Sequence, residues 1–473
     1  TPFSKKITLC TPVNTRGEPM STSALLLIAL ASVVLLLLLV IKAKAHPFVA
    51  LLIVSLLVAF ATGIPADKII TTIEKGMGGL LGHIASIIIL GSMLGVLIEM
   101  SGGAESLAKT LTGVLGAKRT IAALTIVAFI LGTPVFFEVG FIIIIPLIYG
   151  FSKVAHVSPL KFGLPMAGVM LTVHVALPTH PGAAAAAGIL HSDVGWLMLA
   201  GIGVSVVVGI VGYFVARFIN RRHYHLSINV LEQQQTAEVP DLSVNAQQTR
   251  LPPPNALVIG GLIVVPIMLI VSGTLCQALL LPENAVRQLM TVIGTPPVAL
   301  LISLGLASWT LGIRRRMSLK KLGEVTGSAI PSSADVILVA GAGGAFGGVL
   351  VASGIGNALA EALETIHLPL MPAAFLLSLV LRASQGSATV AILTTSGLLS
   401  QAVVGLEPLQ LVLVTLATCF GSLGLSHVND AGFWVVTRYL GLSVPDGLKT
   451  WTVLTTIMGV TGFLITWLLW FAL

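Results

Sequence analysis

The segment SHVNDAG, residues 426–432, places His427, Asn429 and Asp430 within four positions of a chain that is otherwise almost entirely apolar. Burial makes the neutral form of a carboxyl group accessible near neutral pH, so Asp430 and the neighbouring His427 are candidates for carrying a proton. Asn429 and Ser426 could hydrogen-bond a small polar ligand. The alternative is that these side chains only hold a break in a helix.

A second candidate group lies in LGTPVFFEVG, residues 131–140. Glu138 follows two phenylalanines and has no neighbouring cation in the sequence, so it is the leading candidate for proton coupling. Thr133 and Phe137 flank it and could contact a ligand. The alternative role of Glu138 is a hydrogen bond within the turn.

A third group surrounds Arg382 in VLRASQGSATVAILTTSGLL, residues 380–399. Arginine pairs bidentately with carboxylates, so Arg382 could bind an organic acid. The nearby positions that could hydrogen-bond its hydroxyl groups or leave backbone N–H groups exposed are Gln385, Gly386, Ser387 and Thr389. Alternatively, Arg382 forms a salt bridge inside the protein, to Asp430 or to Glu138.

The composition shows what kind of molecule must position these groups. The chain has 473 residues, of which 56% are hydrophobic and 9% charged, and its mean hydropathy is +1.02. These values exclude a water-soluble globule and indicate a polytopic all-α membrane protein. The basic residues lie in short connections, so nucleic acid is not an expected partner. Cys10, Cys276 and Cys419 lack metal or disulfide spacing, and no cofactor is expected.

The apolar segments predict ten membrane crossings. They cover about 22–41, 48–64, 79–100, 161–190, 196–216, 255–273, 289–312, 327–353, 409–438 and 451–472. Segments 120–152 and 370–402 are too long for one simple span and are broken by GTPVFFE and SQGSAT, which predicts two re-entrant hairpins, or alternatively two kinked helices. Residues 1–19 are expected to be a disordered extension, followed by a retained span rather than a cleaved signal.

Lys and Arg residues orient these spans, because cytoplasmic loops collect positive charge. Most of the 25 Lys and Arg residues fall in loops on one side, while Lys68, Lys75 and Arg287 fall in loops on the other. This places both termini in the periplasm. The polar segment 217–252 is expected to be a cytoplasmic linker between two halves.

The two halves, residues 20–216 and 253–473, repeat weakly. GVLIEMSGGAESLAKTL (95–111) aligns with GGVLVASGIGNALAEAL (347–363), and each copy precedes a hairpin and a span interrupted by polar residues. In the first half that interruption contains His180, a further candidate for substrate binding. Two halves of five crossings each must have opposite orientations, and an inverted repeat with broken helices is typical of secondary transporters.

Four stretches together carry a family resemblance: GTPVFFEVGFIIIIPLI, LPTHPGAAAAAGIL, ASQGSATVAILTTSGL and SHVNDAGFW with LKTWTV after it. They resemble the gluconate permease family, whose members carry sugar acids or D-serine. The resemblance implies proton-coupled uptake of a small organic anion through the bacterial inner membrane, an ion-transporter-superfamily fold and a homodimer. Thr133 stands where the family often has Leu, and Thr179 where it usually has Pro, so gluconate or another hydroxy acid is expected as the substrate.

Three other functions compete with this reading. A sodium-coupled organic anion carrier would bind its ion with hairpin carbonyls and hydroxyls, and a D-serine:proton symporter would share the same scaffold. A membrane hydrolase is disfavoured because the sequence has neither an H-E-x-x-H pair nor a G-x-S-x-G elbow. The chain is therefore expected to be a transporter and not an enzyme.

Overall fold

The computed structural model describes residues 20–116, 119–236, 254–365, 368–428 and 430–473. All regular elements in these ranges are helices, which confirms the predicted all-α class. The expected N-terminal extension, residues 237–252 of the expected linker and Asn429 lie outside the described residues.

The described residues up to 236 contain ten α-helices, of which the last lies in the expected linker. They are α1 (Thr22–Leu37), α2 (Pro47–Ala61), α3 (Ala66–Met100), α4 (Gly103–Leu115), α5 (Thr120–Gly132), α6 (Phe137–Val154), α7 (Leu160–Ala176), α8 (Pro181–Leu190), α9 (Val194–Ile219) and α10 (Ile228–Thr236). A π-helical turn, Leu38–Lys42, extends α1.

The second half begins with α11 (Ala256–Leu279), α12 (Ala285–Ile293) and α13 (Pro296–Ala307). It continues with α14 (Leu319–Gly327), α15 (Ala329–Ala352), α16 (Ile355–Thr365), α17 (Leu370–Gln385), α18 (Ala388–Leu399), α19 (Pro408–Leu423), α20 (Ala431–Leu440), α21 (Val444–Gly447) and α22 (Val453–Trp470).

Eight helical stretches in the described residues are long and apolar enough to cross a membrane. They include the broken pair Leu160–Leu190 and the 35-residue α3. The predicted spans at 48–64, 327–353 and 409–438 contain shorter apolar helices, Pro47–Ala61, Ile337–Ala352 and Pro408–Leu423. The chain is therefore a polytopic membrane protein, as the composition predicted, while the count of ten crossings stays a prediction.

Two predicted boundaries need correction. Helix α3 begins at Ala66, so Lys68 and Lys75 lie in a helix and not in an outer loop, because the apolar signal marks only the middle of a longer helix. Within the expected linker, α10 is also helical. Its Val230 is buried, and the Gln234 side chain donates to the Val157 carbonyl oxygen at 2.9 Å, so tertiary contacts fix this segment.

The aligned segments of the two halves have the same local geometry. Helices α3 and α15 end at Met100 and Ala352, which are aligned positions. A left-handed glycine follows in each copy, Gly102 with φ of 81° and Gly354 with φ of 71°, before α4 and α16 begin. Left-handed backbone favours glycine, so both copies form the same turn.

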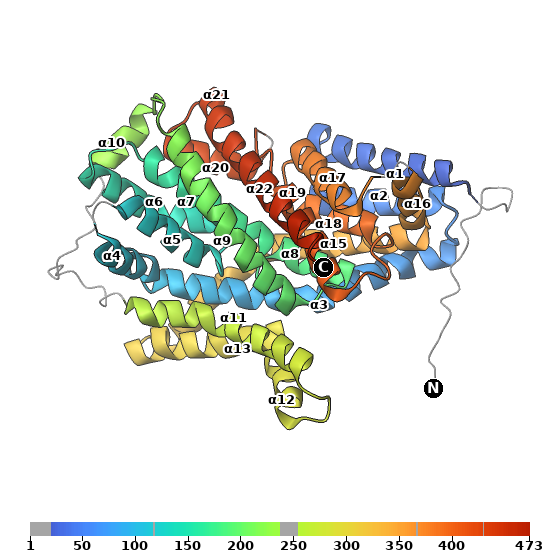
Figure 1. The fold of residues 1–473 in the computed structure, drawn as a ribbon, viewed down its shortest axis with the longest axis horizontal. Helices are drawn as coiled ribbons and strands as arrows, with labels where there is room; N and C mark the ends of the chain where they lie inside the picture. Colours follow the sequence, from blue (N-terminus) through green and yellow to red (C-terminus); the bar gives the residue numbers. More distant parts are fainter. Residues whose placement is uncertain (1–19, 117–118, 237–253, 366–367, 429) are drawn as a thin grey trace.

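Contacts between the halves are reciprocal (Figure 1). Helix α2 of the first half packs on α15 of the second, and the corresponding α13 of the second half packs on α3 of the first. In the same way, the contact of α1 with α16 corresponds to that of α11 with α4, and the contact of α8 with α18 corresponds to that of α20 with α6. A two-fold relation between the halves produces such exchanged contacts. The inversion of one half in the membrane stays a prediction.

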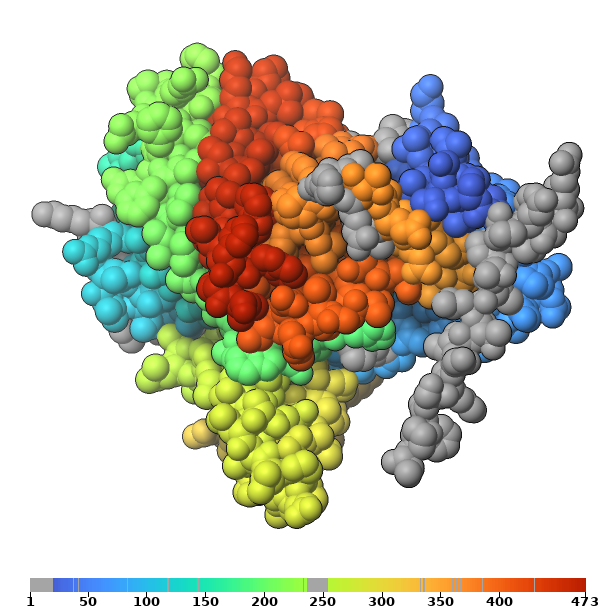
Figure 2. Space-filling model, turned by 45° about the vertical axis from the view of Figure 1, so that its right-hand side comes forward, coloured from blue at the N-terminus to red at the C-terminus, as the bar shows by residue number. Residues whose placement is uncertain are grey.

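Helices α3 and α15 cross at the centre of the molecule, with the α11–α13 unit outside α3 (Figure 1). This unit, in yellow, projects from the body in the space-filling view (Figure 2). At the crossing, a Cβ atom added to Gly76 would lie 2.5 Å from the Gly344 carbonyl oxygen. Small residues therefore allow the two backbones to touch, as is common in membrane helices.

Candidate functional site

Four helical pairs are interrupted near the centre of the fold. The breaks are residues 133–136 between α5 and α6, 177–180 between α7 and α8, 386–387 between α17 and α18, and 424–430 between α19 and α20. Pro134 and Pro178 lack the N–H group that would continue a helix. Gly386, with φ of 81°, ends α17 in the left-handed conformation. Each break leaves backbone polar groups that need other partners.

The four helices that follow these breaks meet in pairs at their N-termini. A Cβ atom added to Gly432 of α20 would lie 3.0 Å from Phe137 Cε1 of α6. A Cβ atom added to Gly182 of α8 would lie 3.5 Å from Thr389 Cα of α18. Helix N-termini carry partial positive charge, so this arrangement favours an anion.

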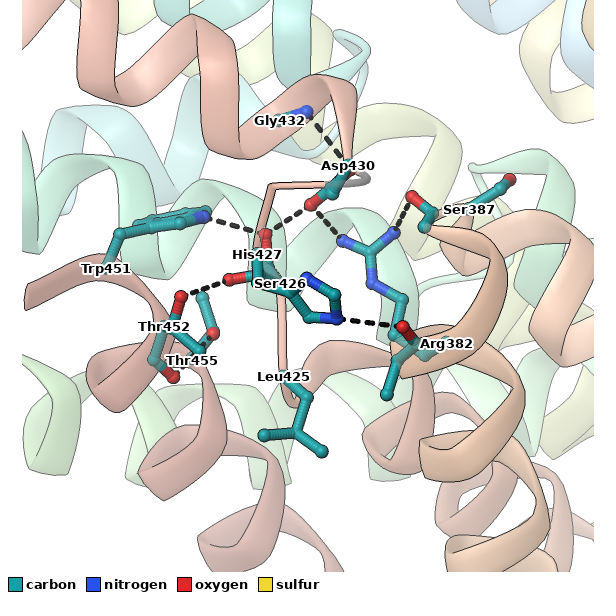
Figure 3. Close-up of polar contacts among 12 residues, drawn as sticks. Arg382, Ser387, Leu425, Ser426, His427, Asp430, Gly432, Trp451, Thr452 and Thr455 are labelled. Atoms are coloured by element: carbon teal, nitrogen blue, oxygen red, sulfur yellow. Dashed lines mark hydrogen bonds and ion pairs between the residues drawn. The ribbon is translucent and has the colours of Figure 1, made fainter. Parts of the chain in front are cut away.

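A buried ion pair joins two of the breaks (Figure 3). Arg382 Nη2, near the end of α17, lies 2.5 Å from Asp430 Oδ2, at the start of α20, and the residues are 2% and 4% exposed. Arg382 Nη1 donates to the Gly386 carbonyl oxygen at 2.7 Å. The Arg382 Nε atom is buried and has no hydrogen-bond partner within the described part of the chain. One donor of this guanidinium is thus left for a further group.

Neighbouring side chains hold the Asp430 carboxylate in place (Figure 3). The Ser426 hydroxyl donates to Asp430 Oδ2, and the Gly432 N–H donates to Oδ1 at 3.0 Å, which caps α20. Trp451 Nε1 donates to Ser426 Oγ at 2.7 Å. The His427 Nε2 atom contacts the Ala383 carbonyl oxygen at 2.8 Å, so the α19–α20 break is tied to the end of α17.

Aromatic side chains connect this network to the first hairpin. The Phe137 ring, 1% exposed, stacks on Trp451 with centroids 5.8 Å apart. Glu138 follows in the first turn of α6, within electrostatic range of Asp430 and Arg382. No ion pair joins Glu138 to a cation in the ranges that the structure describes.

A second polar cluster lies at the α7–α8 break. His180, 1% exposed, contacts the Gly132 carbonyl oxygen through Nε2 at 2.8 Å, and its ring centroid lies 4.5 Å from that of His174. Phe136 packs against both rings, with centroid distances of 6.1 and 6.2 Å. The first hairpin therefore contacts the His180 cluster through Phe136 and the Arg382 network through Phe137.

The remaining predicted positions have local roles. The Thr133 hydroxyl donates to the Phe129 carbonyl oxygen at 3.3 Å, within its own helix. Ser387 caps α18 by accepting from the Val390 N–H at 3.4 Å. Thr389 lies at the contact of α18 with α8. Gln385 ends α17, and its side chain lies outside the described set, as does Asn429.

Sequence reasoning assigned no role to three members of these clusters. Trp451 and Thr452, whose hydroxyl donates to the Ser426 carbonyl oxygen at 2.5 Å, come from the π-helical segment Leu448–Thr452, which is distant in sequence. Their signal was their place in LKTWTV, within a stretch that carries the family resemblance. From the sequence, His174 is a single histidine on an apolar helix face with no evident partner, which is typical of a packing residue.

A cavity of about 810 Å³ lies beyond the C-terminal ends of α8 and α18. Its walls come from α3, the end of α8, α9, α11, α12, α13, α15 and the loop after α18, and include Asp193, Gln277, Gly347 and Gln401. Ala187 of α8 lines it and lies seven residues after His180, so at 1.5 Å per residue about 10 Å of helix separates the cavity from the break. We call this cavity the vestibule. Its volume is in the usual range of small-molecule pockets.

Comparisons with known proteins agree on one family. The family model described as GntP family permease matches residues 24–472. The chain is 61% identical to the inner membrane permease YgbN of Escherichia coli, over 95% of this chain and 99% of that protein. It is 37% identical to the gluconate permease of Bacillus subtilis, over 92% and 97%.

A solved structure shares the fold. The YdaH transporter of Alcanivorax borkumensis, described as having an unusual topology, is similar with a TM-score of 0.56 at 14% sequence identity. The match covers 88% of this chain and 98% of that chain.

Proposed function

We propose, since the chain belongs to the GntP family of permeases, that it carries gluconate or a related sugar acid together with protons across the bacterial inner membrane. Members of this family are transporters and not enzymes, and the chain is a multi-pass protein of the inner membrane. The symport would be directed inward and proceed by alternating access.

The observation that carries the proposal is the buried Arg382–Asp430 pair among four helix N-termini. A substrate carboxylate would compete with Asp430 for the Arg382 guanidinium, whose Nε donor has no partner among the described residues. The helix N-termini would stabilise the anion once it lies between the hairpins. Substrate hydroxyls would then face Thr389, Gln385, Asn429 and His180.

Proton coupling is proposed for Glu138 or Asp430. Protonation of Asp430 would weaken its attraction for Arg382 and release the guanidinium to the substrate. Glu138 needs no such exchange, because no described cation forms an ion pair with it, and it could bind a proton directly. His427 is tied to the Ala383 carbonyl oxygen and would orient the loop during the change.

The membrane potential could drive this transport. One proton that moves inward is worth about 2.3 kcal/mol per 100 mV, which corresponds to roughly fifty-fold accumulation of a solute. A proton and a monovalent anion would together cross without net charge, so such a cycle would use the pH gradient, and a second proton would add the potential.

The vestibule supports an entry route from the periplasm. In the predicted orientation, all of its walls lie at the periplasmic ends of the spans. The alanine run Ala183–Ala187, buried in α8, lies between the vestibule and the breaks. This arrangement fits a carrier whose outer vestibule is open while its central site is closed. A homodimer, implied by the family resemblance, stays a prediction.

Uptake in liposomes tests the proposal. The purified protein would be reconstituted and uptake of radiolabelled gluconate measured in sodium-free buffer, with and without an inward proton gradient. Accumulation that depends on the gradient is expected, with competition by related sugar acids. Uptake that requires sodium at fixed pH would instead establish a sodium-coupled carrier. Proton-driven uptake of D-serine but not of gluconate would assign the other substrate class.

A further inference from the structure

Three polar side chains at the α7–α8 break form a cluster that the transport scheme above leaves largely unused. We call His174, Thr179 and His180 the histidine subsite. Their Nδ1, Oγ1 and Nδ1 atoms are buried, and none has a hydrogen-bond partner in the described ranges. The two imidazole rings lie 4.5 Å apart, centroid to centroid.

The contact of His180 with Gly132 determines the chemistry of its other nitrogen. The Gly132 carbonyl oxygen can only accept, so His180 Nε2 must carry the proton and donate. In the neutral ring, Nδ1 is then a hydrogen-bond acceptor. The Thr179 hydroxyl, beside it in the chain, can donate and accept. An alcohol group, which also donates and accepts, matches this pair, whereas a carboxylate would oppose the Nδ1 lone pair.

Unpartnered polar groups are costly in the interior of a membrane protein. Most Thr hydroxyls in this chain bond a carbonyl oxygen of their own helix, as Thr172 does with Gly168 at 2.9 Å. Thr179 lies in the break and does not. The unpartnered Nδ1 atoms of two adjacent imidazole rings, with the Thr179 hydroxyl next to His180 in the chain, therefore indicate a place where a ligand supplies partners.

A chain of contacts connects the subsite to the Arg382 network. Phe136 contacts both rings of the subsite, while the adjacent Phe137 stacks on Trp451 in the network that holds Asp430. Helix α8, which follows Thr179 and His180, packs through Gly182 on the start of α18. His174 is also within electrostatic range of Arg382.

From this geometry we infer that the histidine subsite binds the hydroxyl tail of the substrate, while Arg382 and the helix N-termini bind its carboxylate. The inference rests on the proposed function and adds the residues that recognise a polyhydroxy chain. His174 and Thr179 become specificity-determining residues, which discriminate a sugar acid from an acid without distal hydroxyls. Loss of one hydrogen bond of this kind lowers affinity by about fivefold to tenfold.

A cycle between protein and substrate variants tests this assignment. Inhibition of gluconate uptake would be measured in liposomes for gluconate and for its 3-, 4-, 5- and 6-deoxy analogues, with the wild type and Thr179→Val. The wild type should bind at least one deoxy analogue about fivefold to tenfold more weakly than gluconate. In Thr179→Val, gluconate should weaken by a similar factor and the penalty for that analogue should disappear.

Three further variants separate recognition from folding. Thr179→Ser keeps the hydroxyl and should retain the wild-type preference, whereas His174→Gln should lose it. Thr172→Val, in the same helical pair, should show no coupling to any analogue. Because the Thr179 hydroxyl has no hydrogen-bond partner among the described residues, Thr179→Val should not lower the thermal unfolding temperature.

The inference would be overturned if Thr179→Val and His174→Gln weakened the binding of gluconate and of all analogues equally, or did not weaken it at all. Either result would leave the proposed function intact. A wild-type protein that takes up no sugar acid would instead overturn the proposed function, and the subsite with it.

Discussion

At the scale of single residues, the stability of the molecule depends on how the buried charge of Arg382 is neutralised. Arg382 and Asp430 are almost fully buried, and each would be costly without the other. The surrounding hydrogen bonds from Ser426 and the Gly432 N–H satisfy the carboxylate. The pair is thus structural in this conformation, and in the proposed cycle it would open so that a substrate carboxylate can replace Asp430 at Arg382.

This dual role predicts different outcomes for single and double variants. Asp430→Asn should lower the free energy of unfolding by about 3–5 kcal/mol, since it leaves the Arg382 charge unpaired. Adding Arg382→Met should recover most of that stability, measured by thermal unfolding in detergent, yet transport should stay absent. Substantial transport by the double variant would show that neither charge takes part in binding or coupling.

Glu138 is the residue at which coupling can be separated from binding. Glu138→Gln keeps the shape of the side chain and removes its titration, so the variant should exchange labelled for unlabelled substrate but not accumulate it. Counterflow and gradient-driven uptake in the same vesicles measure the two activities. Glu99→Gln, near the end of α3, is the matched control and should accumulate substrate normally. Normal accumulation by Glu138→Gln would shift the coupling role to Asp430.

At the scale of helices, the crossing of α3 and α15 depends on glycine. Gly76→Ala would place a methyl group 2.5 Å from the Gly344 carbonyl oxygen, and relieving that clash should cost about 1–3 kcal/mol. Gly78→Ala in the same helix meets nothing within 4 Å and should stabilise the helix by about 0.5–1 kcal/mol. Thermal unfolding of both variants measures the difference, and equal stability would argue against the close crossing.

The sequence predicts the breaks of these helices better than their ends. The prolines and glycines around residues 133–136, 177–180 and 386–387 act locally, so a pattern reveals them. The start of α3 at Ala66 escapes it because the apolar signal marks only the middle of that helix, and α10 escapes it because its place depends on contacts with a distant segment. The aligned turns at Gly102 and Gly354 are local, and the repeat was found through them.

The polar network shows the same division. His427, Asp430 and Arg382 stand out in the sequence as polar groups in apolar segments, and an Arg382–Asp430 bridge was one of the alternatives considered. The ion-pair partner of Arg382 depends on the tertiary contact between the end of α17 and the start of α20, which the sequence does not reveal. Trp451 and His174 have roles only through such meetings, so their residue types alone indicated packing.

At the scale of the whole molecule, the vestibule identifies one face. Gln401 lines it and should lie on the periplasmic side, so Gln401→Cys in a background without native cysteines should react with a membrane-impermeant maleimide added to intact cells. Lys449→Cys, predicted on the cytoplasmic side, should react only after the membrane is opened. Gel-shift labelling measures both, and the reverse pattern would invert the assigned topology.

The four helix N-termini at the centre have a consequence for the cell's energy supply. Each carries roughly half a positive charge, while Asp430 balances the charge of Arg382. A hydronium ion that entered the empty carrier alone would meet this positive field and be repelled. An anion bound in the site would make the local electrostatic potential negative and so favour the binding of a proton. In the proposed symport, this field would therefore limit proton leak through the empty carrier, and protons would cross together with the substrate.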